Sequence, residues 1–416
     1  MRELHSNWKE VKLGDIVDIT MGQSPKSEFY NKRNEGMPFL QGSSTFGHLY
    51  PSFEIYSSDI KKIAVNGSIL MSVRAPVGDL NMANTDICIG RGLCSINGKN
   101  KSLNRYIFYL LNYYKSKIVN IQTGTVFGAI SKDNILNFKV SIPQSEKEQK
   151  YIASILSSFD DKIELNNKTN KILEEMAQTI FKEWFINFNF PNEDGKPYKK
   201  SGGEMIDSEL GKIPKGWKIG TIGDYAKLKS GFAFKNSWWQ NDGIPVIKIQ
   251  NISSGNLNLE QCSFVSEDKY NIAENFRVNG GDLLITLTGS LGKFTIVPKL
   301  DKDALVNQRV GKFFLGEEPV KKLPFLYGIL NELKDLIVSL ANGSVQQNIS
   351  PNDVENVKII FPNDKILNKY NNLMQDIFYK IIFNQRENKK LSNIRDSLLP
   401  KLMTPNGRRA DGEIRV

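Results

Sequence analysis

The chain has 416 residues, of which 40% are hydrophobic and 24% charged, and this composition excludes a largely disordered protein. Its length predicts two or three domains. Three cysteines and two histidines exclude a disulfide framework and give no basis for a structural zinc site. We find no run near the roughly 18 apolar residues of a membrane span and no apolar segment after the N-terminus. We therefore expect a cytoplasmic protein without a membrane segment or a secretory signal.

The net charge of +10 is unevenly distributed along the chain. Residues 1–143 hold 17 basic and 11 acidic side chains, whereas residues 215–362 hold 17 and 15. A basic balance of this size favours a polyanionic partner, with nucleic acid the first candidate. The alternative is that the charge serves only to keep the protein in solution.

The first half of the chain combines a β-rich segment, a long helical segment and a connector. Residues 1–143 contain short β-type runs separated by Gly, Asn and Pro, with a helix predicted over 103–119. Residues 144–190 contain a helical pattern too long for an ordinary globular helix, which predicts a spacer helix that pairs as a coiled coil. Residues 191–214 are rich in Gly, Pro and charge, which predicts a solvated linker.

The second half repeats this organisation. Residues 215–362 form a second β-rich segment, residues 363–403 a second long helix and residues 404–416 a tail. Pro400 predicts a kink or an early end of that helix. The matching segments are Trp8 to Asp15 with Trp217 to Asp224, Val65-Asn66-Gly67 with Val278-Asn279-Gly280, Thr123 to Val126 with Asn342 to Val345, and Ile142-Pro143 with Phe361-Pro362. A repeat of this length indicates a duplicated domain, so we expect an α+β fold with an internal pseudo-twofold axis.

Motifs of catalysis are missing from the sequence. There is no phosphate-binding G-x-x-x-x-G-K-[ST] loop, no complete dinucleotide fingerprint and no Asn-Pro-Pro-Tyr-like motif of an adenine methyltransferase. Asp194-Gly195-Lys196 resembles the end of a nuclease motif, but it lies in the predicted linker and follows no strand. We therefore expect no catalytic residue, no metal site and no cofactor in this chain.

The repeat and its short motifs together resemble the specificity subunit of a type I restriction–modification enzyme. Both β-rich segments open on a similar motif, Trp8 to Asp15 and Pro214 to Asp224, and each precedes a long helix. The connector Ser201-Gly202-Gly203-Glu204-Met205, followed by Ser208 to Pro214, carries the same resemblance. The resemblance covers essentially the whole chain.

The resemblance implies a division of labour between this chain and its partners. Each β-rich segment would be a target recognition domain for one half of an asymmetric, bipartite site in double-stranded DNA. The two long helices would pair antiparallel and set the gap between the half-sites. Two modification subunits would bind S-adenosylmethionine and methylate adenines, and restriction subunits would add translocation and cleavage that depend on ATP and Mg²⁺. Two alternatives remain open: a standalone DNA-modifying enzyme, and a scaffold that does not bind DNA.

Candidate DNA-binding residues follow from the chemistry of recognition. Lys and Arg contact phosphates, whereas Arg, Lys, Asn and Gln can form hydrogen bonds with base edges. In the first domain the candidates are Lys26, Arg33, Gln41, Ser43, Arg74, Arg91 and Lys132. In the second they are Lys235, Trp238, Trp239, Lys248, Gln250, Asn251, Lys293, Gln308, Arg309, Gln346 and Gln347. Because neighbouring residues of a strand face opposite sides, one of the two adjacent tryptophans would point outward, towards DNA or a modification subunit. The alternative is that both pack in the core.

The long helices carry a seam of apolar residues at alternating spacings of four and three. Two asparagines lie in the middle of each seam: Asn166 and Asn170 in the first, Asn384 and Asn388 in the second. An antiparallel pair places Asn170 near Asn384. The same register places Asn166 near Asn388, and Arg395 opposite Phe159 with its stem packed and its head extended to water. A buried asparagine fixes register, because a slipped pairing leaves its amide among methyl groups.

Overall fold

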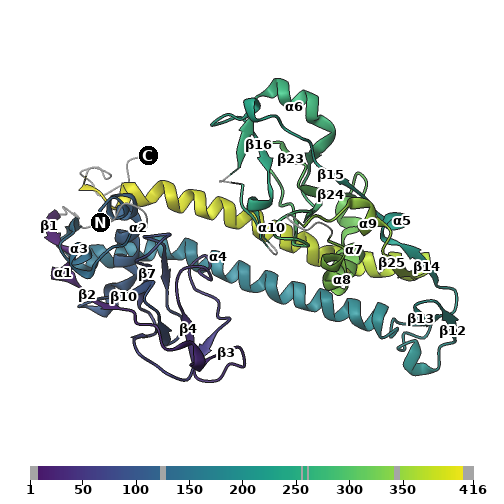
Figure 1. Cartoon of the computed structure of the whole chain (residues 1–416), viewed down its shortest axis with the longest axis horizontal. Coiled ribbons are helices and arrows are strands. Elements are labelled where there is room, and N and C mark those ends of the chain that lie inside the picture. The colour runs from purple at the N-terminus through teal and green to yellow at the C-terminus, as the bar shows by residue number, and fades with distance from the viewer. Residues whose placement is uncertain (1–7, 122–127, 254–255, 260–261, 342–346, 406–416) are drawn as a thin grey trace. The chain divides into compact units, whose positions relative to one another are not determined.

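The computed structural model describes residues 8–121, 128–253, 256–259, 262–341 and 347–405, and every structural statement below concerns these residues. The chain divides into two compact units (Figure 1). Unit 1 comprises Met1–Leu165 and Asn388–Val416, and unit 2 comprises Asn166–Glu387. Both long helices therefore contribute to both units, whereas the sequence analysis treated them as segments separate from the β-rich domains.

Unit 1 contains two main sheets and a two-stranded ribbon. The four-stranded antiparallel sheet has the order β2 (Val17–Met21), β10 (Leu93–Gly98), β7 (Ile69–Ser72), β8 (Leu80–Met82). The five-stranded sheet has the order β3 (Tyr30–Asn31), β5 (Tyr56–Ser57), β4 (Met37–Leu40), β9 (Ile87–Ile89), β6 (Ile63–Ala64). The ribbon pairs β1 (Trp8–Lys12) with β11 (Lys139–Pro143), and the helices of the domain are α1 (Leu13–Ile16), α2 (Asn104–Val119) and α3 (Lys132–Leu136).

Unit 2 repeats the four-stranded antiparallel sheet and has a four-stranded counterpart of the five-stranded sheet. Its antiparallel sheet has the order β15 (Lys227–Ser230), β24 (Val310–Phe314), β21 (Leu283–Thr286), β22 (Phe294–Ile296). A mixed sheet has the order β19 (Ser263–Val265), β16 (Ile244–Ile247), β23 (Ala304–Val306), β20 (Arg277–Val278). Outside the connector, two ribbons pair β14 (Lys218–Thr221) with β25 (Lys358–Phe361), and β17 (Ile252–Ser253) with β18 (Asn256–Leu257). The helices are α5 (Ile222–Tyr225), α6 (Glu267–Ala273), α7 (Leu323–Glu332), α8 (Lys334–Ser339) and α9 (Pro351–Glu355).

The central strand of each antiparallel sheet is covered on both faces. All four residues of β7 are buried, and successive side chains of a strand point to opposite faces. Ile69 and Met71 face a core that includes α2, whereas Leu70 faces a second, smaller core. In β21 the division is the same, with Leu283 facing one core and Leu284 the other. The predicted α+β class and its duplication are therefore confirmed.

The first long helix, α4 (Glu146–Phe181), is shorter than the predicted segment 144–190. It ends in a π-helical turn over Lys182–Ile186, which places the neighbouring aromatic side chains of Trp184 and Phe185 together in the core. The second, α10 (Asp364–Leu402), contains Pro400 and ends two residues after it. Within the described residues, no helix has both the length and the apolar character needed to cross a membrane.

The helices run antiparallel within each unit. In unit 2 the side-chain amide of Asn384 donates to Asn170 Oδ1 at 2.8 Å, so these two asparagines meet as the seam predicts. Asn166 donates to Glu387 Oε2 at 2.7 Å. In unit 1 the Arg395 guanidinium forms an ion pair with the buried Asp160. The expectation that the head of Arg395 extends to water is therefore wrong, because a buried carboxylate on α4 neutralises it.

The connector is not the solvated linker that its composition predicts. It contains a hairpin of β12 (Met205–Ser208) and β13 (Gly211–Pro214), and its Tyr198, Met205 and Ile213 pack in the core of unit 2. The Phe190 ring stacks on Tyr198 at 4.6 Å and on Trp217 at 4.9 Å between ring centroids. These three aromatic side chains fix the segment on the core despite its Gly, Pro and charged residues.

Candidate nucleic-acid interface

Two first-domain candidates lie together at the carboxyl ends of a parallel strand pair. Strands β4 and β9 run parallel, and Gln41 follows the first while Arg91 follows the second after one glycine. The Ser24 hydroxyl donates to Gln41 Oε1 at 2.8 Å and accepts from the Arg91 backbone N–H at 3.1 Å. Both candidate side chains are exposed. The Ser24 hydroxyl thus holds the Gln41 amide and the backbone of Arg91 together at the carboxyl ends of these strands.

The other first-domain candidates are dispersed. Arg33 forms an ion pair with Glu35 at 2.9 Å, and the Lys26 ammonium lies 3.7 Å from Glu28. Ser43 donates to Asp79 at 3.1 Å. Arg74 is exposed in an isolated bridge with Ala129, and Lys132 is exposed at the start of α3.

In the second domain an aromatic and cationic cluster surrounds Lys248. Its ammonium lies 3.6 Å from the centroid of the Trp239 ring and donates to Ser263 Oγ at 2.7 Å. Partial burial lowers the pKa of Lys248. Trp238 stacks on Phe232 at 5.9 Å, and the ammonium of the candidate Lys235 lies 5.9 Å from the Trp238 ring. Both tryptophans are half-buried and pack against a core cluster of unit 2, which agrees with the alternative that both pack in the core.

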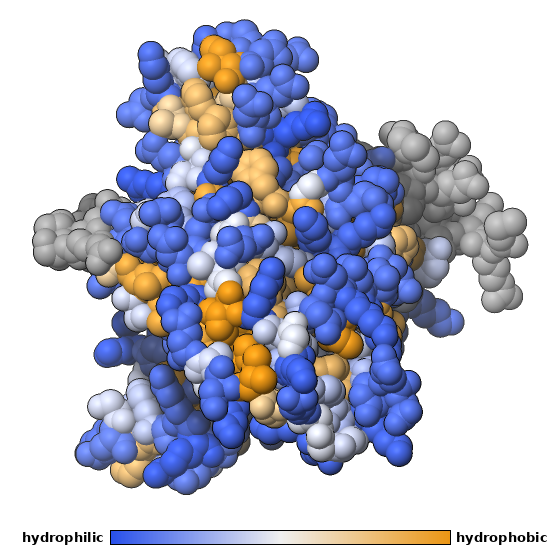
Figure 2. Space-filling model, turned by 90° about the vertical axis from the view of Figure 1, so that its right-hand side faces the viewer, coloured by the Kyte–Doolittle hydropathy of each residue, from blue (hydrophilic) through white to orange (hydrophobic). Residues whose placement is uncertain are grey.

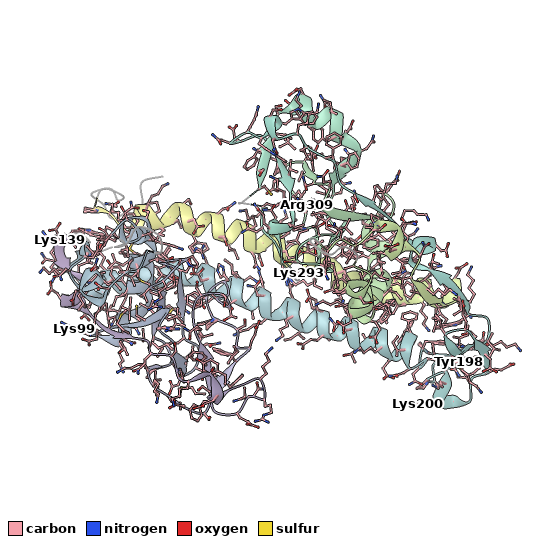
Figure 3. All side chains as sticks on the ribbon, viewed as in Figure 1. Lys99, Lys139, Tyr198, Lys200, Lys293 and Arg309 are labelled. Atoms are coloured by element: carbon pink, nitrogen blue, oxygen red, sulfur yellow. The ribbon has the colours of Figure 1, made fainter. Side chains whose placement is uncertain are left out.

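The remaining second-domain candidates differ in the solvent exposure of their side chains. Gln308 and Arg309 are exposed in the turn between β23 and β24, and Gln250 and Gln347 are also exposed. Lys293, labelled with Arg309 in Figure 3, is half-buried immediately before β22. Asn251 is wrong as a DNA contact, because it is 2% exposed and its Oδ1 accepts from the Lys248 backbone N–H at 2.9 Å. Gln346 lies outside the described residues.

Sequence reasoning missed a buried polar network in unit 1. Asp160 on α4 accepts from Tyr109 Oη at 2.5 Å, contacts His48 Nε2 at 2.9 Å and pairs with Arg395 of α10. Burial alone would raise the pKa of Asp160, but the hydrogen bonds and the guanidinium hold it below its ordinary value. The network fastens the loop at His48 and helix α2 to both long helices within the unit.

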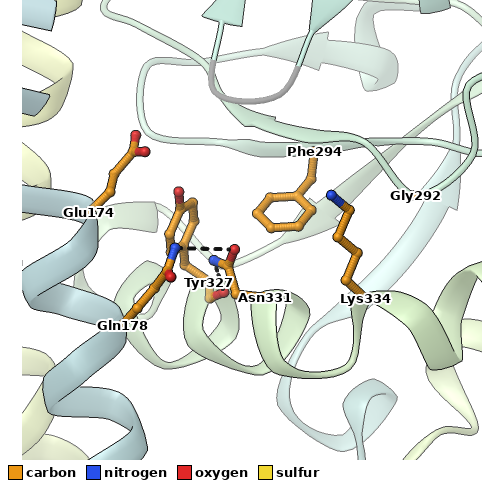
Figure 4. A pocket seen from close by; sticks show the side chains of 7 residues that line it. All are labelled: Glu174, Gln178, Gly292, Phe294, Tyr327, Asn331 and Lys334. Carbon is orange, nitrogen blue, oxygen red and sulfur yellow. Dashed lines mark hydrogen bonds between the residues drawn. The ribbon is translucent and has the colours of Figure 1, made fainter. Parts of the chain in front are cut away.

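Unit 2 has a small polar pocket of about 150 Å³ beside α4 (Figure 4). Gln178 donates to Asn331 Oδ1 at 3.4 Å along one wall. Burial, followed by the nearby charge of Glu175, raises the pKa of Glu174 to about 7. The lining residues are Glu174, Gln178, Gly292, Phe294, Tyr327, Asn331 and Lys334. Across the described residues, no cluster of three His, Cys, Asp or Glu side chains is placed to hold a metal ion.

The repeated domains and their helices match a known family. The family model of the type I restriction modification DNA specificity domain matches residues 5–175 and again 214–393. The chain therefore belongs to this family, and it carries two copies of the domain.

Curated relatives match along nearly their whole length. The type I restriction enzyme MjaIX specificity subunit of Methanocaldococcus jannaschii is 29% identical, with 100% of this chain and 95% of the relative covered. The HindI specificity subunit of Haemophilus influenzae is 24% identical, with 96% and 99% covered. The crystal structure of a type I restriction–modification S subunit from M. genitalium has the same fold, with a TM-score of 0.57, 16% identity, and 96% and 97% coverage.

Proposed function

We propose that this specificity subunit recognises a bipartite site in double-stranded DNA, with one half-site read by each repeated domain. The matched sheets of the two units are the observation that carries the proposal. A duplicated scaffold gives two recognition surfaces built to one plan, and different side chains on them give each half-site its own sequence. The excess of basic residues in both domains supplies the attraction to phosphates.

Partner subunits supply the catalysis in this proposal. Modification subunits carrying S-adenosylmethionine methylate adenines, and restriction subunits use ATP and Mg²⁺, all in the cytoplasm.

Hydrophilic residues predominate on the face shown in Figure 2, with small hydrophobic patches between them. In unit 2, large apolar side chains remain exposed on α4 and α10 at spacings of one helical turn, which suits the docking of a partner. They are Ile172 and Met176 on α4, and Tyr379 and Phe383 on α10.

Exchange of residues 1–143 for the corresponding domain of another specificity subunit tests the proposal. Methylation mapping of cells with the complete system should reveal a change in one half of the methylated sequence. The other half-site and the gap length should stay as they are, because the second domain and both helices are unchanged. A change in both halves contradicts separate reading by the two domains.

The domain exchange tests the scaffold alternative, and incubation of the pure chain with labelled S-adenosylmethionine and DNA tests the enzyme alternative. A scaffold that does not bind DNA would leave the methylated sequence unaltered after the exchange. A standalone modifying enzyme would transfer labelled methyl groups to DNA without any other subunit. The family relationship supports neither alternative.

A further inference from the structure

The two recognition domains share one backbone arrangement at the carboxyl ends of their parallel strands. Leu40 pairs with Ile89 in the first domain, and Ile247 pairs with Val306 in the second. We call the residues that follow these strands, with the turn beside them, the carboxyl-end frame. It comprises residues 22–24, 41 and 90–92 in unit 1, and residues 231–233, 248 and 307–309 in unit 2.

Backbone hydrogen bonds establish which positions correspond. The N–H of Gly90 donates to Leu40 O at 2.8 Å, and the N–H of Asn307 donates to Ile247 O at 2.9 Å. Four further bonds of the first frame each have a counterpart of nearly equal length in the second. In each bond the N–H of the first residue donates to the carbonyl oxygen of the second. Gly22 to Leu93 corresponds to Gly231 to Val310, Gln23 to Ile89 corresponds to Phe232 to Val306, Leu93 to Gly90 corresponds to Val310 to Asn307, and Val73 to Gly92 corresponds to Leu287 to Arg309. Gln41 therefore corresponds to Lys248, Arg91 to Gln308, and Ser24 to Ala233.

The frame is too tightly packed to shift. A Cβ on Gly22 would lie 2.1 Å from Gly90 O, and one on Gly231 would lie 2.2 Å from Val306 O. A Cβ on Gly92 would lie 2.4 Å from Gln41 O. The glycines thus let the loops approach closely, and the backbones that carry the candidate side chains are held in place.

Side chains at corresponding positions of the frame differ in chemistry, although the backbone bonds match and Gly22 corresponds to Gly231. The first domain presents an amide at Gln41, positioned by the Ser24 hydroxyl, and a guanidinium at Arg91. The second presents an ammonium at Lys248 and an amide at Gln308. Arg and Lys pair with guanine and Gln pairs with adenine in the major groove. In open α/β sheets, ligands likewise bind at the carboxyl ends of parallel strands.

We propose that the carboxyl-end frames are the base-reading positions, with Gln41 and Arg91 specifying one half-site and Lys248 and Gln308 the other. This inference rests on the proposed function and adds which residues carry its specificity. The fixed backbone gives both domains one docking geometry. The different side chains at corresponding positions give each domain a different target sequence in DNA. Candidates outside the frame, such as Arg33, contact phosphates or solvent.

The test uses the full chain assembled with its modification subunits. DNA duplexes carry the methylated site of the wild-type complex with each base pair replaced in turn, and methylation rates are measured for every duplex. Gln41→Ala and Arg91→Ala should each reduce discrimination at one or two base pairs of one half-site by about 5- to 100-fold. Lys248→Ala and Gln308→Ala should do so only in the other half-site.

Two further variants keep the result interpretable. Gln41→Glu retains the oxygen that accepts from Ser24 but removes the amide donors, so it should alter base preference even if the alanine variant folds poorly. Arg33→Ala is the matched control, because this exposed arginine lies outside the frame and should leave discrimination unchanged.

The outcomes distinguish the inference from the function on which it rests. Equal weakening of all duplexes by the frame variants, or unchanged discrimination, overturns the base-reading role. A wild-type complex that prefers no duplex overturns the proposed function itself. Altered discrimination in the half-site of the other domain also overturns the inference.

Discussion

Asp160 and Phe378 occupy corresponding positions of the two long helices, and each contacts a corresponding tyrosine. The carboxylate of Asp160 accepts from Tyr109, whereas the ring of Phe378 lies 5.2 Å from that of Tyr327 in a T-shaped contact. Both tyrosines precede the helix residue by 51 positions. The duplicated architecture thus holds the first domain on its helices through an ionic network and the second through aromatic packing.

Replacing Asp160 by Asn should destabilise the protein by about 2 to 3 kcal/mol at pH 7, because Arg395 would lose its buried counter-ion and keep only the exposed carboxylate of Asp396. Urea unfolding measures this loss. Asp161→Asn is the matched control: the Asp161 side chain is 56% exposed, so its ion pair with Arg105 is worth less than about 1 kcal/mol. Equal effects of the two substitutions would contradict the role of the buried network.

The lowered pKa of Asp160 also predicts a pH dependence. The unfolded chain takes up a proton on this carboxyl at a higher pH than the folded chain does. Its contribution to stability is therefore complete above the ordinary aspartate pKa and is lost as the pH falls through the lower folded value. Below about pH 4, the wild-type protein should lose stability more steeply than Asp160→Asn.

Glu174 should show the opposite dependence. Its pKa is raised to about 7, so the folded chain retains the proton to a higher pH than the unfolded chain. The associated stability is present below the ordinary glutamate pKa and is lost as the pH rises from there through 7. Glu174→Gln should therefore unfold like wild type at about pH 4 and gain about 1 kcal/mol at about pH 8.5, after allowance for solvent screening. Thermal unfolding at both pH values, with the exposed Glu175→Gln as control, checks this.

At the scale of elements, the asparagine pair between α4 and α10 lies in a mostly apolar seam. Replacing Asn170 or Asn384 alone by Leu should cost about 1 to 3 kcal/mol, since each leaves a buried amide without its partner. The double replacement should cost less than the sum of the two, because neither amide remains. Urea unfolding of the four proteins measures this coupling, and strict additivity would argue against a functional pair.

The seam between the two long helices was predicted from the sequence only in part. The strict alternation of four and three predicts Phe159 and Ile377 inside, whereas the structure buries Asp160 and Phe378. An α-helix has 3.6 residues per turn, whereas alternating steps of four and three average 3.5. The strict alternation therefore drifts away from the buried face of the helix, and two successive steps of four return to it. Repetition and helix length are local patterns and were predictable.

Pairing between distant residues was not predictable in the same way. Arg395 meets Asp160 across 235 positions, and Ser24 joins Gln41 to the turn at Arg91. The candidate list contained Gln41 and Arg91 from their chemistry alone. The proximity of Gln41 and Arg91 follows from strand order and loop packing, which composition does not encode. The burial of Asn251 as a cap has the same origin.

At the scale of the whole molecule, the two units are linked by continuous helices with a fixed register on each side. The pair Asp160–Arg395 belongs to unit 1 and the pair Asn170–Asn384 to unit 2. An insertion in α4 alone would force one of these pairs out of register. Equal insertions in both helices, between the two pairs, would preserve both.

Seven residues inserted after Leu165 and seven after Glu387 should therefore keep each unit intact and lengthen both helices by about 10 Å. DNA rises 3.4 Å per base pair along each strand, so the gap between half-sites should grow by about three base pairs while both half-site sequences persist. Methylation mapping measures the gap, and the same insertion in α4 alone is the control that should abolish a defined site. A doubly extended chain that still methylates the original gap would mean that the helices do not set the spacing.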